Sequence, residues 1–134
     1  MTSGGMTADA IVTTKISPRP FADTVSRFTD MLAAKGVKVF AVIDQRAEAR
    51  SVGQDLRDTT LVIFGNPAAG TPVMAAVPLA ALDLPLKVVI WADDGQVKVS
   101  YVPPKEVGRR YDLTDDLTAR LAAIDALTDT LVSQ

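Results

Sequence analysis

The sequence predicts an α+β fold, a two-layer sandwich in which a single mixed five-stranded sheet carries helices mainly on one face. Five short β-branched or apolar runs alternate with helical patterns in the order βαβαβαββα. The first and last helical patterns each have an apolar stripe that needs a sheet face to cover it. The last two strands meet at Asp93-Asp94-Gly95-Gln96, a hairpin turn. This hairpin argues against the alternative, a strictly parallel, doubly wound sheet.

The five strands are expected at residues 10–16, 37–44, 59–65, 86–92 and 97–102. The third contains the run Leu-Val-Ile-Phe, which is apolar on both faces and indicates a central position in the sheet. The fifth alternates apolar and polar residues, so one face of the sheet should contact water.

Two long helices are expected to cover the sheet. The first begins at Phe21 and ends near Lys35, because apolar residues recur at helical spacing and Gly36 is a stop signal. The last is predicted as one continuous helix over about residues 114–132, from the stripe Leu117, Leu121, Ile124, Leu127 and Leu131.

Three shorter helical segments are expected between the strands. Asp44 is predicted to cap a helix at 45–52, and Thr71 to cap another that begins at Pro72 and ends at Val77. A helical turn should follow at 79–82. Asp83 lies two residues before Pro85, and we interpret it as a turn residue. The alternative is a buried acid with a shifted pKa.

The chain has 134 residues, which fits one domain at residues 10–134. Residues 1–9 are small and polar with two glycines, and they are expected to form a disordered tail. The sequence has no cysteine, which excludes disulfides, zinc-thiolate sites and a cysteine nucleophile. It also has no histidine, the commonest general base and metal ligand. We therefore predict no catalytic residue and no metal site, and the sequence leaves the cofactor unknown.

Charge and hydropathy limit the partners. The net charge is −2 and the basic residues are spread along the chain, so nucleic acid is not an expected partner. No apolar run reaches the ~18–20 residues that cross a bilayer, and the start lacks the features of a signal peptide. A cytoplasmic protein without a membrane segment is the expectation.

Four short motifs follow one another along the chain: Ile43-Asp44-Gln45, Phe64-Gly65-Asn66-Pro67, Gly70-Thr71 and the run Ala-Leu-Asp-Leu-Pro-Leu-Lys at 81–87. Together they resemble the bacterial family called domain of unknown function 302, over roughly residues 10–132. The resemblance implies a dimeric α+β structure and supplies no established activity. Family members usually carry a histidine where this chain has Gln45. A role that needs imidazole there would be lost, whereas a hydrogen-bonding role would not.

The segment from Phe64 to Thr71 is the first candidate site, because an apolar strand is followed directly by several residues that favour turns. Ordered loops at strand ends often carry binding sites. In the functional interpretation, backbone N–H groups of residues 68–70 bind an anion at the positive end of the following helix. In the structural interpretation, Asn66 closes a turn and Thr71 caps the helix. Both remain open at this stage.

Asp44 and Gln45 form the second candidate. Asp44 is a helix cap in one interpretation and a general base or metal ligand in the other. If the strands at 37–44 and 59–65 were parallel neighbours, Asp44 would lie beside the 66–71 loop. The predicted ligand-binding set is Asp44, Gln45, Phe64, Gly65, Asn66 and Thr71.

Three functions follow from these candidates. The first is a non-catalytic, homodimeric small-ligand-binding or regulatory domain with a small anionic ligand. The second is an enzyme that uses Asp44 as a carboxylate base and the 66–71 loop as an anion-binding loop. The third is a structural homodimeric interaction module.

Overall fold

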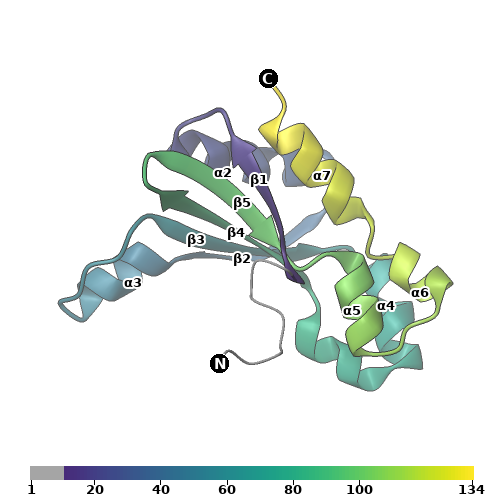
Figure 1. Cartoon of the computed structure of the whole chain (residues 1–134). Coiled ribbons are helices and arrows are strands. Elements are labelled where there is room, and N and C mark those ends of the chain that lie inside the picture. Colours follow the sequence, from purple (N-terminus) through teal and green to yellow (C-terminus); the bar gives the residue numbers. More distant parts are fainter. Residues whose placement is uncertain (1–10) are drawn as a thin grey trace, which may run out of the picture.

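The computed structural model describes residues 11–134, and its centre is one five-stranded sheet (Figure 1). The strands are β1 (Thr13–Ser17), β2 (Lys38–Asp44), β3 (Thr59–Gly65), β4 (Leu86–Asp93) and β5 (Gln96–Tyr101). Their spatial order is β1-β5-β4-β3-β2, so β3 is an interior strand, while β1 and β2 form the edges. The expected tail at residues 1–9 lies outside the described residues.

The sheet differs from the expected mixed sheet, because all four neighbouring strand pairs are antiparallel. The connection between β2 and β3 explains the difference for that pair. A parallel pair needs a crossover helix that packs on the sheet. The helix in this connection, α3 (Gln45–Ser51), buries none of its residues. It extends beyond the end of the sheet, and the chain turns straight back (Figure 1).

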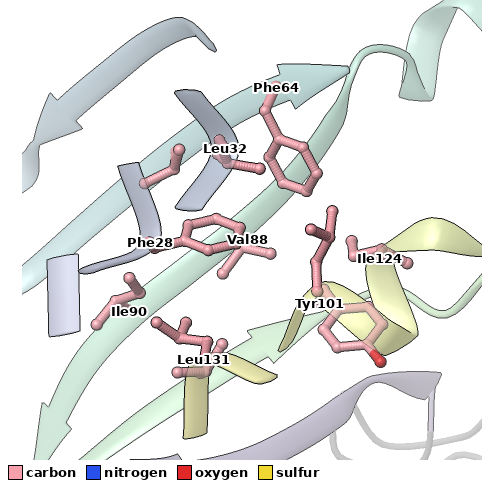
Figure 2. Packing of buried hydrophobic residues seen from close by; sticks show 11 residues of the cluster. Phe28, Leu32, Phe64, Val88, Ile90, Tyr101, Ile124 and Leu131 are labelled. Carbon is pink, nitrogen blue, oxygen red and sulfur yellow. The ribbon is translucent and has the colours of Figure 1, made fainter. Parts of the chain in front are cut away.

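One face of the sheet is covered by α2 (Phe21–Ala34) and α7 (Ala123–Val132). Phe28 and Leu32 of α2 and Leu131 of α7 are fully buried there against the strands (Figure 2). The rings of Phe28 and Phe64 meet edge to face, with their centroids 5.2 Å apart. The expected two-layer α+β sandwich is therefore confirmed.

Within residues 11–134, the opposite face of the sheet is left open. Leu61 and Ile63 of β3 and Val89 and Trp91 of β4 point to this side and are partly exposed. None of these four residues belongs to the hydrophobic clusters that the described residues form. This open face is defined here by Leu61, Ile63, Val89 and Trp91.

A second hydrophobic cluster lies beyond one end of the sheet. It is built by α4 (Pro67–Ala76), the 3₁₀ helix η1 (Pro78–Asp83), α5 (Pro104–Arg110) and α6 (Asp115–Ala119). Its buried members are Val73, Ala80, Val107 and Leu121. The helix α5 was not expected, because the pair Pro103-Pro104 reads as a chain break. Pro104 instead takes the first position of the helix, where its missing N–H costs nothing.

The predicted continuous helix at 114–132 is wrong, because the chain divides into α6 and α7 around Arg120. Its apolar stripe serves two different clusters. Leu117 and Leu121 pack in the cluster beyond the sheet, whereas Ile124, Leu127 and Leu131 pack on the sheet. A straight helix could not present one stripe to both. Short i to i+3 hydrogen bonds, such as Leu121 N–H to Thr118 O at 3.0 Å, change the chain direction between them.

The helix α4 begins at Pro67, five residues earlier than the predicted start at Pro72. Asn66 is its N-cap, and the Asn66 side-chain oxygen accepts a hydrogen bond from the Ala68 N–H at 2.9 Å. Thr71 therefore lies inside the helix and caps nothing. The chain offers two helix-start signals, Thr71-Pro72 and Asn66-Pro67. The helix starts at the second pair, in which Asn66 is the N-cap and Pro67 is at N1.

Replacing Asn66 with alanine removes the side-chain cap of α4. We expect Asn66→Ala to lower the free energy of unfolding by about 1 kcal/mol, the usual cost of a lost N-cap. Asn66→Asp keeps an acceptor at the same place and should stay close to the wild type. Urea denaturation of the three proteins measures the difference. Equal stabilities of Asn66→Ala and wild type would contradict the capping role.

Candidate functional site

A pocket of about 300 Å³ lies where the sheet meets the second cluster. The end of β3, the first turns of α4, the start of β4 and the chain after α6 enclose it. Its walls are mainly apolar and include Phe40, Pro67, Met74, Leu84, Pro85, Leu86 and Leu121. Its volume is at the lower end of the ~300–1,000 Å³ typical of small-molecule sites.

Two glycines keep the pocket open. A Cβ atom on Gly65 would meet Pro85 Cβ at 3.5 Å and Phe40 Cε2 at 3.9 Å. A Cβ atom on Gly70 would meet only Met74 Cε, at 3.8 Å. Both positions would accept a methyl group, but a longer side chain would extend into the space between the walls. The two glycines of the motifs thus leave space at the pocket wall.

A β-bulge places Phe40 in the pocket wall. The pairing of β2 with β3 shifts register between Val39 and Ala41, so Phe40 has no partner on β3. An extra residue of this kind re-aims a side chain at the edge of a sheet. Phe40 remains 45% exposed, and Lys38 Nζ lies 4.9 Å from its ring centroid.

In the predicted anion-binding loop, the N–H groups of residues 68–70 all donate hydrogen bonds to Asn66. The Ala68 N–H donates to the Asn66 side chain. The N–H groups of Ala69 and Gly70 both donate to the Asn66 carbonyl oxygen, at 2.9 and 3.0 Å. The geometry of this segment is that of a capped helix, and the structural interpretation of Asn66 holds.

Asp44 and Gln45 lie at the other end of the sheet. In the antiparallel β2–β3 pair, Gly65 is opposite Lys38 and Asp44 is opposite Thr60. Thr60 and Gly65 are five residues apart on β3, so Asp44 and Gly65 are separated by about 17 Å along the sheet, at ~3.3 Å per residue. Asp44 accepts a hydrogen bond from the Ala47 N–H at 3.0 Å and caps α3. A carboxylate at Asp44 and a ligand at the 66–71 segment cannot meet.

The remaining predicted residues divide between the core and the pocket. Phe64 is only 1% exposed and packs against Phe28 in the core. Gly65, Asn66 and Thr71 all line the pocket. Three of the six predicted residues thus line the candidate pocket, and the sequence did not indicate the rest of its wall. Phe40 and Arg120 come from distant parts of the chain, and no local pattern connects them with Asn66.

An ion pair fixes the wall that contains Leu84 and Pro85. Asp83, at the end of η1, accepts hydrogen bonds from Tyr111 and from Arg110 Nη1, the latter at 2.7 Å. Burial acts to raise the pKa of the Asp83 carboxyl, but the hydrogen bonds from Tyr111 and Arg110 outweigh it and hold the pKa below its ordinary value. The hydrogen bond to Asp83 also raises the pKa of the Tyr111 hydroxyl. These contacts join η1 to α5 and so support the pocket.

Three residues with polar side chains line the pocket, Asn66, Thr71 and Arg120, and the side chain of each can donate hydrogen bonds. Within residues 11–134, Arg120 forms no ion pair. By contrast, in a second hollow near Trp91 the ammonium of Lys98 pairs with Asp93 at 2.7 Å. The pocket at Asn66 is therefore the better candidate for a ligand.

Two further features bear on the chemistry of the described chain. Residues 11–134 contain no group of three or more acidic side chains placed to hold a metal ion. No helix among the same residues has the length and apolar character needed to cross a membrane.

A solved structure has the same fold. The crystal structure of the uncharacterized conserved protein DUF302 from Bacillus stearothermophilus matches with a TM-score of 0.77 at 18% sequence identity. The match covers 91% of this chain and 95% of that chain. At this identity the likeness concerns the fold alone.

Curated relatives are longer proteins. The chain is 33% identical over 106 residues to "Fluoride-specific ion channel FluC 1" of Brucella suis biovar 1 (strain 1330), covering 78% of this chain and 42% of the relative. The match to "Fluoride-specific ion channel FluC 2" of Brucella melitensis biotype 1 has the same identity and covers 39% of that relative. The chain thus spans less than half the length of these relatives.

The sequence profile of the family described as "Domain of unknown function DUF302" matches residues 12–131. This range contains the whole sheet, all of α2 and all of α7 except its last residue. It also contains every residue of the pocket. The chain therefore belongs to the DUF302 family.

Proposed function

We propose that this protein is a non-catalytic, homodimeric, cytoplasmic domain that binds a small ligand in the pocket at the end of β3 and acts as a regulatory module. The pocket itself carries the proposal. It is concave and apolar, with a few polar groups at defined places, which is the usual form of a small-molecule site. The enzyme alternative has no comparable support, because Asp44 lies at the opposite end of the sheet.

The location of the pocket supports a regulatory role. Leu86 lines the pocket and packs against both hydrophobic clusters, and Leu121 belongs to the cluster beyond the sheet. A ligand in the pocket would contact the sheet and the helical cluster together. A ligand changes a conformational equilibrium only when it contacts the two states differently. A ligand at the junction of two packed units would meet this condition if the units shifted relative to one another.

The curated relatives give a second argument for regulation. They are named as ion channels, and the matched region is less than half of each. A channel needs segments that cross the bilayer, and the described residues of this chain provide no such helix. In those relatives a domain of this kind would accompany the channel segment. A ligand-binding domain beside a channel is suited to controlling it, and we extend only this general role to the present chain.

Filling the pocket tests the ligand-binding function. Gly70→Leu projects a side chain into the pocket and removes a helix-interior glycine, which costs about 1 kcal/mol relative to alanine. We expect the variant to be as stable as wild type or more stable, and to lose binding of the neutral apolar dye N-phenyl-1-naphthylamine. Gly70→Ala is the matched control and should keep binding. Equal dye affinity of Gly70→Leu and wild type would refute the site.

Dimerisation is expected through the open face. Leu61, Ile63, Val89 and Trp91 form a partly exposed apolar surface on adjacent strands, and such surfaces mark protein contacts. Pairing by two-fold symmetry would place this face against its copy. We expect light scattering to give a dimer mass over a tenfold dilution at micromolar concentration. Leu61→Lys should yield a monomer, whereas Val52→Lys, at an exposed position directly after α3, should not. A monomeric wild type would disprove the dimer.

A further inference from the structure

We infer that the ligand of this pocket is a small apolar monocarboxylate, such as a medium-chain fatty acid, whose carboxylate pairs with Arg120. The inference rests on the proposed ligand-binding function and specifies the chemistry of the same site. It replaces the earlier expectation of an anion held by backbone N–H groups. The positive group that can meet an anion is a side chain at the pocket wall, not the first turn of α4.

The sign of the charge follows from the polar groups of the pocket. Arg120 supplies up to five N–H donors and a permanent positive charge. The Asn66 side-chain oxygen accepts one hydrogen bond from the Ala68 N–H, and the NH₂ group of the same side chain adds two donors. Thr71 contributes a hydroxyl, and no aspartate or glutamate lines the pocket. The site therefore complements a group that accepts hydrogen bonds and carries negative charge.

The apolar walls determine the rest of the ligand. Phe40, Met74, Leu84 and Leu86 offer carbon surface and no hydrogen bonds from their side chains. A phosphate or a polyanion would lose its hydration against these walls and find one cationic side chain in return. A carboxylate on an apolar chain matches both parts of the site. The planar guanidinium also fits a carboxylate with two parallel hydrogen bonds.

The backbone next to Arg120 is packed, and this determines where its exposed side chain starts. Leu121 is only 2% exposed and is packed in the cluster beyond the sheet. The Arg120 N–H and the Leu121 N–H donate to Leu117 O and Thr118 O at 3.2 and 3.0 Å. Arg120 thus reaches the pocket from the turn between α6 and α7.

Calorimetric titration of the full chain with three probes of equal chain length tests the inference. The probes are octanoate, 1-octanol and octylammonium. We expect octanoate to bind at least about tenfold more tightly than either other probe, as one charge-assisted hydrogen-bonded pair allows. Arg120→Gln should weaken octanoate about tenfold and change 1-octanol less than twofold. Arg50→Gln, an exposed charge on α3 at the other end of the sheet, is the matched control and should leave both affinities unchanged.

The outcomes separate this inference from the proposed function. If Gly70→Leu abolishes dye binding but octanoate binds no better than 1-octanol, or Arg120→Gln leaves octanoate binding unchanged, the pocket stands and the carboxylate inference is overturned. If octylammonium binds best, the pocket prefers a positively charged ligand, and the inference is overturned. If octanoate does not bind, the inference falls, and the dye experiment alone decides the proposed function.

Discussion

The hydrogen bonds that Asn66 accepts from the first turn of α4 determine the shape of this end of the molecule. Three consecutive N–H groups, those of Ala68, Ala69 and Gly70, are directed to its side chain and its carbonyl. They start α4 immediately after β3, so the helix turns away from the sheet and leaves the pocket between them. The same bonds occupy the donors that an anion would need, and the ligand chemistry therefore depends on side chains.

The local part of the fold could be predicted from the sequence. Strand periodicity, the capping of α3 by Asp44 and the stop at Gly36 are each encoded within a few residues, and each is present in the structure. Apart from the β4–β5 hairpin, strand direction was not predictable in this way, because it depends on whether a connecting helix packs on the sheet. The division of the last helix was not predictable either, since an apolar stripe does not show that its two halves pack in two different hydrophobic clusters.

The candidate site was predictable only where it is contiguous in the chain. Gly65, Asn66 and Thr71 lie within one dense motif and all reach the pocket. Phe40 enters through a β-bulge, and a bulge depends on the partner strand. Arg120 enters through the turn after α6, so its position follows from the packing of α5 and α6. At their contact Gly108 has no room for a side chain, since a Cβ atom there would lie 2.5 Å from Thr118 Oγ1.

The central claim is that the pocket between β3, α4 and α6 is where a small ligand binds. Two-dimensional NMR of isotope-labelled protein titrated with octanoate tests it most directly, because it maps contacts residue by residue. The account predicts that the largest chemical-shift changes occur at Gly65, Gly70 and Leu121. Changes centred on Trp91 and Lys98, on the open side of the sheet, would contradict it and move the binding site to the other face.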